Sequence, residues 1–233
     1  MKKFDDIRFQ DLQEGLYDPN IFKAFFLAGG PGSGKSFVTN RAFGGTGLKT
    51  INSDNAFERS LKKNGLSLKM PEDEAEARDI LRDRAKAMTG SQMDLSIRGR
   101  LGLVIDGTGR DYDKIKEQKA LLDQLGYDSY MIFVNTTLEV ALERNELRDR
   151  VLPQSIVSDS HKEVNRNIGA FQGLFGSSNF MVVDNNEQKT EDQAKKRFKM
   201  LVKQGLGKFV KAPIKSKKAL SWIRKQKILQ GKG

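Results

Sequence analysis

The chain has no cysteine and a single histidine, His161. The lack of cysteine excludes both a disulfide framework and a thiolate metal site. One imidazole leaves little scope for histidine chemistry. The chemistry must therefore rest on carboxylates, hydroxyls, lysines and arginines, and the composition suits a reducing compartment.

Long hydrophobic runs are also missing. The longest apolar stretch, near residues 24–28, is far shorter than the roughly 20 residues that cross a bilayer, and the amino terminus MKKFDDIRFQ is charged throughout. We therefore expect a soluble, cytoplasmic protein with no membrane partner. With 233 residues, of which 37% are hydrophobic, the chain can bury one main core.

Acidic residues are absent from the last 39 positions. Residues 195–233 hold 14 of the 41 basic residues, whereas residues 1–194 carry 27 basic against 30 acidic ones. The net charge of +11 therefore comes from this end of the chain. Such a segment attracts polyanions by counterion release, although a basic tail can also be merely solvated. We expect a nucleic-acid partner here.

Short apolar runs alternate with helical patterns along the chain. The alternation predicts parallel strands near residues 24–28, 49–53, 101–105, 129–135 and 179–184. It predicts helices near residues 34–43, 55–64, 72–89, 111–125, 137–150, 154–172 and 190–204. Strands such as LGLVID and SYMIFV are apolar throughout, which is typical of a sheet covered on both faces. We expect a main domain over residues 1–204.

The segment after residue 204 reads differently. Residues 205–216 resemble a linker, and Ala219, Trp222, Ile223 and Leu229 would line one face of a short basic helix. We expect residues 205–233 to form a basic extension. Trp222 either stacks on a nucleic-acid base or anchors the helix on its own domain, and the second is the commoner use of a tryptophan.

The segment GGPGSGKS, residues 29–36, fits the pattern G-x-x-x-x-G-K-[ST] between an apolar strand and a helix. Glycines let backbone amides turn inward, and the following helix adds its positive end, so the loop predicts a polyphosphate site. An ordinary glycine turn is the alternative. The predicted fold is a three-layer α/β P-loop NTPase of the nucleoside-kinase type, with a five-stranded parallel sheet. The residues expected to bind ATP are Gly30, Gly32, Ser33, Gly34, Lys35, Ser36 and Phe37.

Asp54 follows the second predicted strand, at the sheet edge where open α/β folds bind ligands. A carboxylate there can take the proton of an attacking hydroxyl. The alternative is a role in capping the next helix, although Asn55 can cap without Asp54. We expect Asp54 to be the catalytic base and to contact the substrate.

The third strand ends in the sequence LVIDGTGR, which brings Asp106, Thr108 and Arg110 to the same edge. We expect all three to bind substrate, with Arg110 holding a phosphate. Ser36 is the expected Mg²⁺ ligand, with Asp106 bound to the metal directly or through water. The alternative is a turn in which Asp106 and Thr108 satisfy local backbone groups.

Arg144 and Arg148 lie four residues apart with no carboxylate at helical spacing from either one. Two such guanidiniums ahead of Pro153 suit a lid that stabilises the transferred phosphoryl group, so we expect both to be catalytic. Arg150 is the weaker candidate because Glu146 precedes it by four positions. A solvated face is the alternative.

These motifs together resemble the kinase domain of bacteriophage polynucleotide 5′-hydroxyl kinases over about residues 22–185. The resemblance implies that Lys35 and Ser36 bind phosphates and metal, that Asp54 activates the 5′-hydroxyl, and that Arg148, with Arg144 beside it, contacts the phosphates. Phe57 stands where that family carries an arginine. The IDGTGR segment is also similar to the zeta-toxin kinases, and in that family the matching Asp106, Thr108 and Arg110 imply a nucleotide-sugar site.

The leading expectation is a kinase that uses ATP and Mg²⁺ to phosphorylate a hydroxyl, first of all a polynucleotide 5′ end. A zeta-like kinase of a nucleotide sugar or another small molecule is the second reading. A nucleotide-binding protein that associates with nucleic acid without transferring phosphate is the third.

Overall fold

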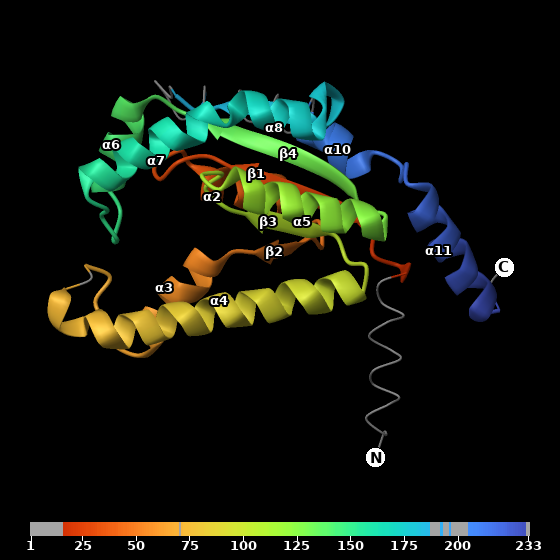
Figure 1. Ribbon diagram of the computed structural model, residues 1–233, viewed down its shortest axis with the longest axis horizontal. Coiled ribbons are helices and arrows are strands. Elements are labelled where there is room, and N and C mark those ends of the chain that lie inside the picture. Colours follow the sequence, from red (N-terminus) through yellow and green to blue (C-terminus); the bar gives the residue numbers. More distant parts are fainter. Residues whose placement is uncertain (1–15, 70, 187–191, 193–195, 197–204, 232–233) are drawn as a thin grey trace, which may run out of the picture.

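The structure is a computed structural model that describes residues 16–69, 71–186, 192, 196 and 205–231. Five parallel strands in these residues form one sheet in the order β2-β3-β1-β4-β5 (Figure 1). They are β1 (Lys23–Ala28), β2 (Lys49–Ile51), β3 (Leu103–Asp106), β4 (Asp128–Asn135) and β5 (Phe180–Asp184). All five expected strands are therefore present, and β1 is central.

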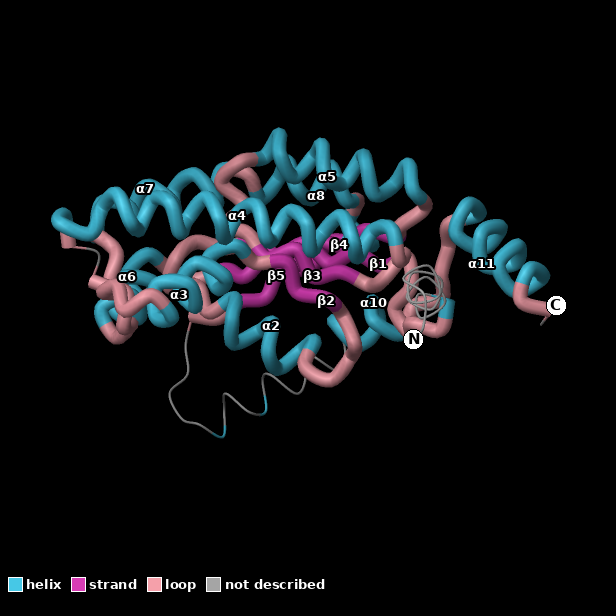
Figure 2. Tube along the Cα trace, turned by 90° about the horizontal axis from the view of Figure 1, so that it is seen from below, coloured by secondary structure: helices cyan, strands magenta, loops and turns pink. Residues whose placement is uncertain are grey.

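Both faces of the sheet are covered, as the apolar runs within its inner strands predict. Helices α5 (Tyr112–Leu125), α7 (Gln154–Arg166) and α8 (Ile168–Phe175) cover one face, where Phe26 packs with Phe171 and Phe175. Helices α2 (Lys35–Phe43) and α10 (Gly207–Lys211) lie over the other, where Phe25 packs among Val38 and the residues around it. Figure 2 shows the strands between these helices. The three-layer α/β fold is confirmed.

A smaller apolar cluster lies beyond the β2 edge, between α3 (Ser53–Lys63) and α4 (Ala75–Arg98). Phe57 and Leu61 of α3 pack there against Leu81 and Ala85 of α4. A short 3-10 helix, η1 (Glu72–Glu74), precedes α4. The long helix α4 therefore forms a wall beside the sheet and is not one of its covering layers.

Several helix boundaries differ from those expected. Helix α4 runs to Arg98 and not to residue 89, because Met93 and Ile97 beyond Gly90 still pack on the core. The single helix expected over 154–172 is broken at Asn167, whose side-chain amide donates to the carbonyls of Gly109 and Arg110, at 2.9 Å each. The helix expected over 190–204 falls almost wholly outside the described residues.

Helix α6 (Leu138–Glu146) ends four residues earlier than expected. The side chain of buried Asn145 bonds the backbone of Leu152 twice, as donor at 2.8 Å and as acceptor at 3.1 Å. These two bonds close the segment between α6 and α7 into a compact loop. Arg148 therefore lies on that loop and not on the helix.

The basic extension docks on the domain at the amino ends of the strands. In α11 (Lys217–Leu229), Ala219 is fully buried, and the Trp222 ring meets the Phe22 ring edge-on at 5.4 Å. The Lys215 amide donates to the Asp128 carboxylate at 2.7 Å. Trp222 is therefore an anchor, whereas Leu229 is 78% exposed, contrary to expectation.

The stretch expected to be a linker, residues 205–216, contains helix α10. The ammonium of buried Lys23 donates to the Val210 carbonyl, and burial lowers the pKa of Lys23. This contact ties α10 to β1. The division of the chain at residue 204 stays a prediction.

Candidate active site

The loop from β1 to α2 is shaped by its glycines. Gly32 and Gly34 have φ of 77° and 85°, in the left-handed region that favours glycine. A Cβ on Gly32 would lie 2.2 Å from the Ala141 carbonyl oxygen, and one on Gly34 would lie 2.2 Å from the Asn185 amide nitrogen. No side chain caps the amino end of α2. The first amides of that helix are therefore left for an anion.

Lys35 is the first residue of α2 and folds over this loop. Its ammonium donates to the carbonyls of Gly29 and Gly30, at 2.5 and 3.2 Å. Burial lowers the pKa of Lys35, while the nearby carboxylates of Asp106 and Asp54 raise it. The cation is therefore enclosed and poorly compensated, which favours binding of a polyphosphate next to it.

Asp54 lies in the first turn of α3, three positions beyond the end of β2. The cap of α3 is Asn52, whose side-chain oxygen accepts the Asn55 amide at 3.0 Å. Asp54 is exposed, and no hydrogen bond or ion pair to its side chain occurs in the part of the chain that the structure describes. Since Asn52 does the capping, the Asp54 carboxylate is available for a substrate.

Asp106 ends β3 and faces the same region. The Asn52 amide donates to its carboxylate at 2.6 Å, so Asn52 both caps α3 and fixes Asp106. Burial raises the pKa of Asp106, whereas Lys35 and the hydrogen bond from Asn52 lower it. No local pattern points to Asn52, because its bond to Asp106 joins residues that are 54 positions apart in the chain.

The loop after β3 is joined to the glycine loop by backbone hydrogen bonds. The Gly29 amide donates to the Thr108 carbonyl at 2.9 Å, and the Gly107 amide donates to the Leu27 carbonyl at 3.3 Å. The two loops therefore form one surface at the carboxyl edge of β1 and β3.

These groups line one cavity of about 370 Å³, which we call the phosphate cavity. Most of the residues expected at the site contribute to it: Gly30, Gly32, Gly34, Lys35, Ser36, Asp54, Asp106, Thr108, Arg144 and Arg148. Asn52, Asn55, Glu58 and Arg150 line it as well. Carboxylates, hydroxyls and cations from five elements thus converge on a volume suited to a small ligand.

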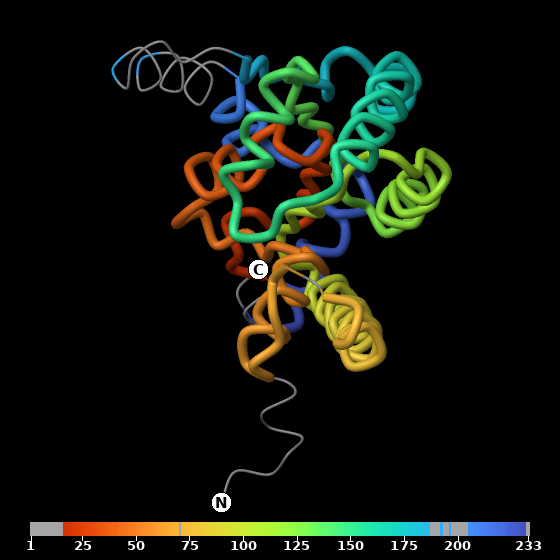
Figure 3. Tube along the Cα trace, turned by 90° about the vertical axis from the view of Figure 1, so that its left-hand side faces the viewer, coloured from red at the N-terminus to blue at the C-terminus, as the bar shows by residue number. Residues whose placement is uncertain are grey.

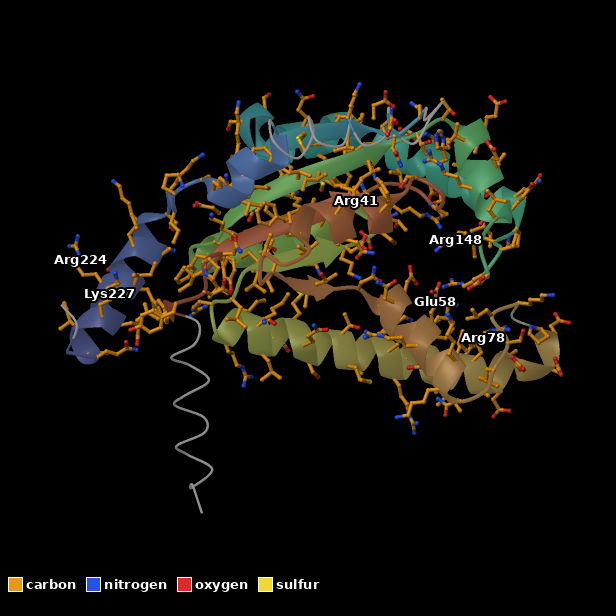
Figure 4. All side chains as sticks on the ribbon, turned by 180° about the vertical axis from the view of Figure 1, so that it is seen from behind. Arg41, Glu58, Arg78, Arg148, Arg224 and Lys227 are labelled. Atoms are coloured by element: carbon orange, nitrogen blue, oxygen red, sulfur yellow. The ribbon has the colours of Figure 1, made fainter. Side chains whose placement is uncertain are left out.

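Arg144 and Arg148 line the cavity from α6 and from the loop that follows it. We call this loop, residues 147–153, the lid. Burial lowers the pKa of Arg144, and one of its terminal nitrogens is buried with no hydrogen-bond partner among the described residues. Arg148 is exposed on the loop between α6 and α7. Figure 3, which faces this end of the molecule, shows that loop crossing it. Figure 4 shows Arg148 and Glu58 on the two sides of the opening.

Arg150 holds the lid to α3. Its guanidinium pairs with the Glu58 carboxylate at 3.5 Å and lies over the Phe57 ring at 5.6 Å. Arg82 contacts the same ring at 4.7 Å. The sequence placed Glu146 beside Arg150, but the structure pairs Arg150 with Glu58, and only the tertiary fold brings these residues together. Phe57 is buried and serves packing.

Three expected residues lie apart from the cavity walls. The guanidinium of Arg110 pairs with Glu163 at 2.5 Å. Arg110 lines neither the phosphate cavity nor a second cavity that adjoins it. Phe37 is exposed, with the Arg41 guanidinium 5.0 Å from its ring. The buried Ser33 hydroxyl has no partner in the described residues, and the Ser33 carbonyl accepts the Asn185 amide at 2.7 Å.

The oxygen donors of the cavity fit a magnesium ion that is held mainly by phosphates and water. Such an ion takes one or two protein oxygens, and Ser36 and Asp106 can supply them. The residues that the structure describes hold no cluster of three or more side chains of the kinds that would bind a metal unaided. The uncapped start of α2 and the enclosed Lys35 fit the triphosphate itself.

The sheet order, the glycine loop and the lid define a nucleotide-binding P-loop domain of the nucleoside-kinase-like class. The chain belongs to the AAA_33 family, described as an AAA domain, whose model matches residues 25–168. No curated protein matches the chain.

Solved structures share this fold at low sequence identity. The AvrRxo1-ORF1:AvrRxo1-ORF2 complex with sulphate ions has a TM-score of 0.51 and 14% identity, over 77% of this chain and 62% of that chain. The native form of that complex has a TM-score of 0.50 and 13% identity, over 94% and 83%. The PezAT toxin–antitoxin system of Streptococcus pneumoniae gives 0.49 and 17%, over 89% and 98%.

No helix in the described part of the chain is long and apolar enough to span a bilayer.

Proposed function

We propose that the protein is a kinase that transfers the γ-phosphoryl group of ATP to a hydroxyl. One observation carries the proposal: a glycine loop with its lysine, two carboxylates and two lid arginines line the same cavity. Binding of a nucleotide with its magnesium ion uses one carboxylate, which Asp106 at the end of β3 can supply. A second carboxylate, Asp54 at the start of α3, also lines the cavity, and nucleotide binding alone does not account for it.

The proposed reaction is a single displacement. The acceptor hydroxyl oxygen bonds the γ-phosphorus, the bond from that phosphorus to the β–γ bridging oxygen breaks, and ADP leaves with the electron pair. Asp54 takes the hydroxyl proton, since its carboxylate is free and lines the cavity. A bound Mg²⁺ would neutralise charge on the phosphates, with Ser36 and Asp106 as its protein contacts.

Lys35 and the lid arginines supply positive charge to the same group. Lys35 lies at the loop, and Arg144 and Arg148 line the cavity from the lid. Charge that spreads over the phosphoryl oxygens in the transition state is stabilised by cations fixed in a site with little water. The unpartnered nitrogen of Arg144 is therefore proposed to bind a phosphate oxygen.

The acceptor is proposed to be a small molecule, with a polynucleotide 5′-hydroxyl as the second candidate. The second candidate is favoured by Lys217, Arg224 and Lys225, which are exposed on α11 and suit a nucleic-acid partner. However, α11 packs on Phe22, just before β1, whereas the phosphate cavity follows the far end of that strand. Six residues of strand span about 20 Å. Figure 4 shows Arg224 and Lys227 at one end and Arg148 at the other.

A polynucleotide held by α11 would therefore need to pass along the whole sheet to present its end. The likeness to phage polynucleotide kinases is thus proposed to extend to the phosphate chemistry more than to the acceptor. A cytoplasmic location belongs to the same proposal, because the chain has no cysteine and the reaction needs ATP.

Two measurements test the proposal. Calorimetry with Mg²⁺ and ATP should show binding to the full chain and none to Lys35→Met. Incubation with γ-labelled ATP should then label small hydroxylated compounds, with 5′-hydroxyl DNA and RNA offered in parallel. Binding without transfer to any acceptor would instead support a non-catalytic protein associated with nucleic acid. No binding at all would overturn the nucleotide site.

A further inference from the structure

A second cavity, of about 410 Å³, adjoins the phosphate cavity, and we call it the side chamber. The two share Asp106, Gly107 and Thr108, so they meet at the carboxyl end of β3. Helix α4 forms one wall, the first half of α5 another, and β1, β2 and β3 the floor. A volume of several hundred Å³ suits a small molecule, whereas a folded nucleic acid needs an open groove.

Gly90 shows that α4 leaves room for this chamber. It lies in the interior of a 24-residue helix, where glycine is less favourable than alanine. A Cβ at Gly90 would meet no atom within 4 Å, so no close packing explains the glycine. Gly107, on the shared border, is equally unobstructed. Both glycines line the chamber and keep space open where a side chain would fit.

The walls of the side chamber carry two lysines from separate helices. Lys114 lies at the start of α5, and no hydrogen bond or ion pair to its side chain occurs among the described residues. Lys86 of α4 has only an exposed 3.4 Å contact with Asp83. The carboxylate of Asp111, which also lines the chamber, accepts the Lys114 amide as the cap of α5 and keeps its negative charge. Two ammonium groups are thus available to an anion.

The rest of the chamber lining combines apolar side chains with polar ones and with the carboxylates of Asp106 and Asp111. Ile105, Ile115 and Met93 supply apolar surface, and Asp106 supplies the charge at the border with the phosphate cavity. A ligand that fills the chamber would therefore present a polar end to Asp106 and an anionic end to the lysines, with a carbon skeleton between them.

We propose that the side chamber binds the acceptor, a small hydroxylated molecule that carries a carboxylate or phosphate group. Its hydroxyl would reach past Asp106 into the phosphate cavity, toward Asp54 and the γ-phosphate, and its anionic group would lie near Lys86 and Lys114. The proposal rests on the kinase function proposed above. It assigns to α4, which that function did not use, the selection of the substrate.

The experiment offers γ-labelled ATP and four acceptor pools to the full-length protein: neutral sugars and polyols, hydroxy acids, sugar phosphates, and a 5′-hydroxyl oligonucleotide. Label should enter the hydroxy acids or the sugar phosphates and not the neutral pool. Gly90→Leu should fill the chamber and lower kcat/KM for that acceptor at least tenfold while leaving ATP affinity within twofold. Ala87→Leu, three residues earlier on the same helix and outside the chamber lining, is the matched control and should retain activity.

A second pair of variants tests the lysines separately from the fold. Lys114→Ala should raise the KM for the anionic acceptor at least fivefold with little change in kcat, and Lys116→Ala, exposed two residues away, should not. The Tm of Gly90→Leu is measured beside that of Ala87→Leu, and equal values would show that lost activity in Gly90→Leu is not a folding defect.

Two outcomes would overturn the chamber. They are label in the neutral pool or the oligonucleotide alone, and full activity of Gly90→Leu. No label in any pool, with or without ATP binding, would instead overturn the kinase proposal itself, so the two failures are distinguishable.

Discussion

The carboxyl and amino ends of the strands differ in how their buried polar atoms find hydrogen-bond partners. At the carboxyl end, Ser33, Arg144 and Arg150 each bury a polar atom that has no partner in the described residues. At the amino end, the Tyr127 hydroxyl donates to the Leu101 carbonyl at 3.1 Å, and the Asp18 carboxylate accepts the Gly102 amide at 3.0 Å. The first end lines the phosphate cavity. The second is closed over by α11, although Tyr130 and Asn179 toward that end also bury a polar atom without a partner in the described residues.

The difference separates hydrogen-bond partners that a ligand has to supply from those that the fold itself supplies. A buried polar atom without a partner costs stability, typically about 1–3 kcal/mol. Arg144 and Arg150 bury such atoms while lining the phosphate cavity, and we propose phosphate oxygens as their missing partners. At the amino end, α11 covers the surface, with Trp222 packed on Phe22. Changes at the two ends should therefore separate activity from stability.

The largest expected effect is at the glycine loop. Lys35→Met should lower the transfer rate by at least about 10³-fold, because it removes the cation nearest the phosphates. Burial lowers the pKa of Lys35, so the charged lysine opposes folding and the variant should melt at the same or a higher temperature. Labelled-phosphate transfer and thermal melting check both parts, and a lower Tm with full activity would reverse the assignment.

Asp54→Asn should come next, with a fall in kcat of about 10²-fold, the scale of a lost general base. The KM for ATP should stay within about twofold, since the asparagine keeps the shape of the side chain. Asp79→Asn, exposed on α4, is the control. Steady-state kinetics decide the matter, and an unchanged kcat would remove Asp54 from the chemistry.

At the closed end, Trp222→Ala should cost about 2 kcal/mol of unfolding free energy, because it removes the edge-on contact with Phe22 and buried apolar surface. Transfer to a small acceptor should be unaffected. Arg224→Ala, exposed on the same helix, should change stability by less than about 0.5 kcal/mol. Denaturant unfolding measures both, and loss of transfer in folded Trp222→Ala would break the separation of the two ends.

The smallest effect is on pH dependence. Burial raises the pKa of Asp106, so its carboxyl group holds a proton more tightly in the folded protein than in the unfolded chain. The stability that this protonated carboxyl group contributes is therefore lost as the pH rises through the raised pKa. Transfer needs the ionised carboxylate and should fall as the pH drops through this raised pKa. Asn52→Ser keeps a cap on α3 but removes the hydrogen bond to Asp106, so the acid limb should move to higher pH.

A pH–rate profile of kcat/KM for both proteins checks this prediction. The Tm of Asn52→Ser reports on the cap independently. An acid limb that is identical in the two proteins would mean that Asn52 does not act on Asp106.

Much of the fold and of the phosphate site could be predicted from the sequence. Strand periodicity and the GGPGSGKS motif are local signals, and parallel strands bring their carboxyl ends to one edge, so Lys35, Asp54 and Asp106 were placed together correctly. Contacts between distant elements left no such signal. Neither the pairing of Arg110 with Glu163 nor that of Arg150 with Glu58 shows at any sequence spacing.

The cap of α3 and the side chamber were missed for related reasons. Asn52 was assigned to a strand that in fact ends at Ile51, so the pattern pointed to Asn55 as the cap. The chamber exists because α4 continues past Gly90, and a glycine inside a helical pattern reads as a helix end. Whether such a glycine ends a helix or clears space is decided by its neighbours in three dimensions.

The backbone hydrogen bond from the Gly29 amide to the Thr108 carbonyl links the two loops of the site. Its amide belongs to the glycine loop and its carbonyl to the loop shared with the side chamber, so neither loop can shift without stretching it. Deuterium uptake at Gly29 should therefore slow when an acceptor alone occupies the chamber. A single exchange rate would then register the second substrate before any nucleotide is added.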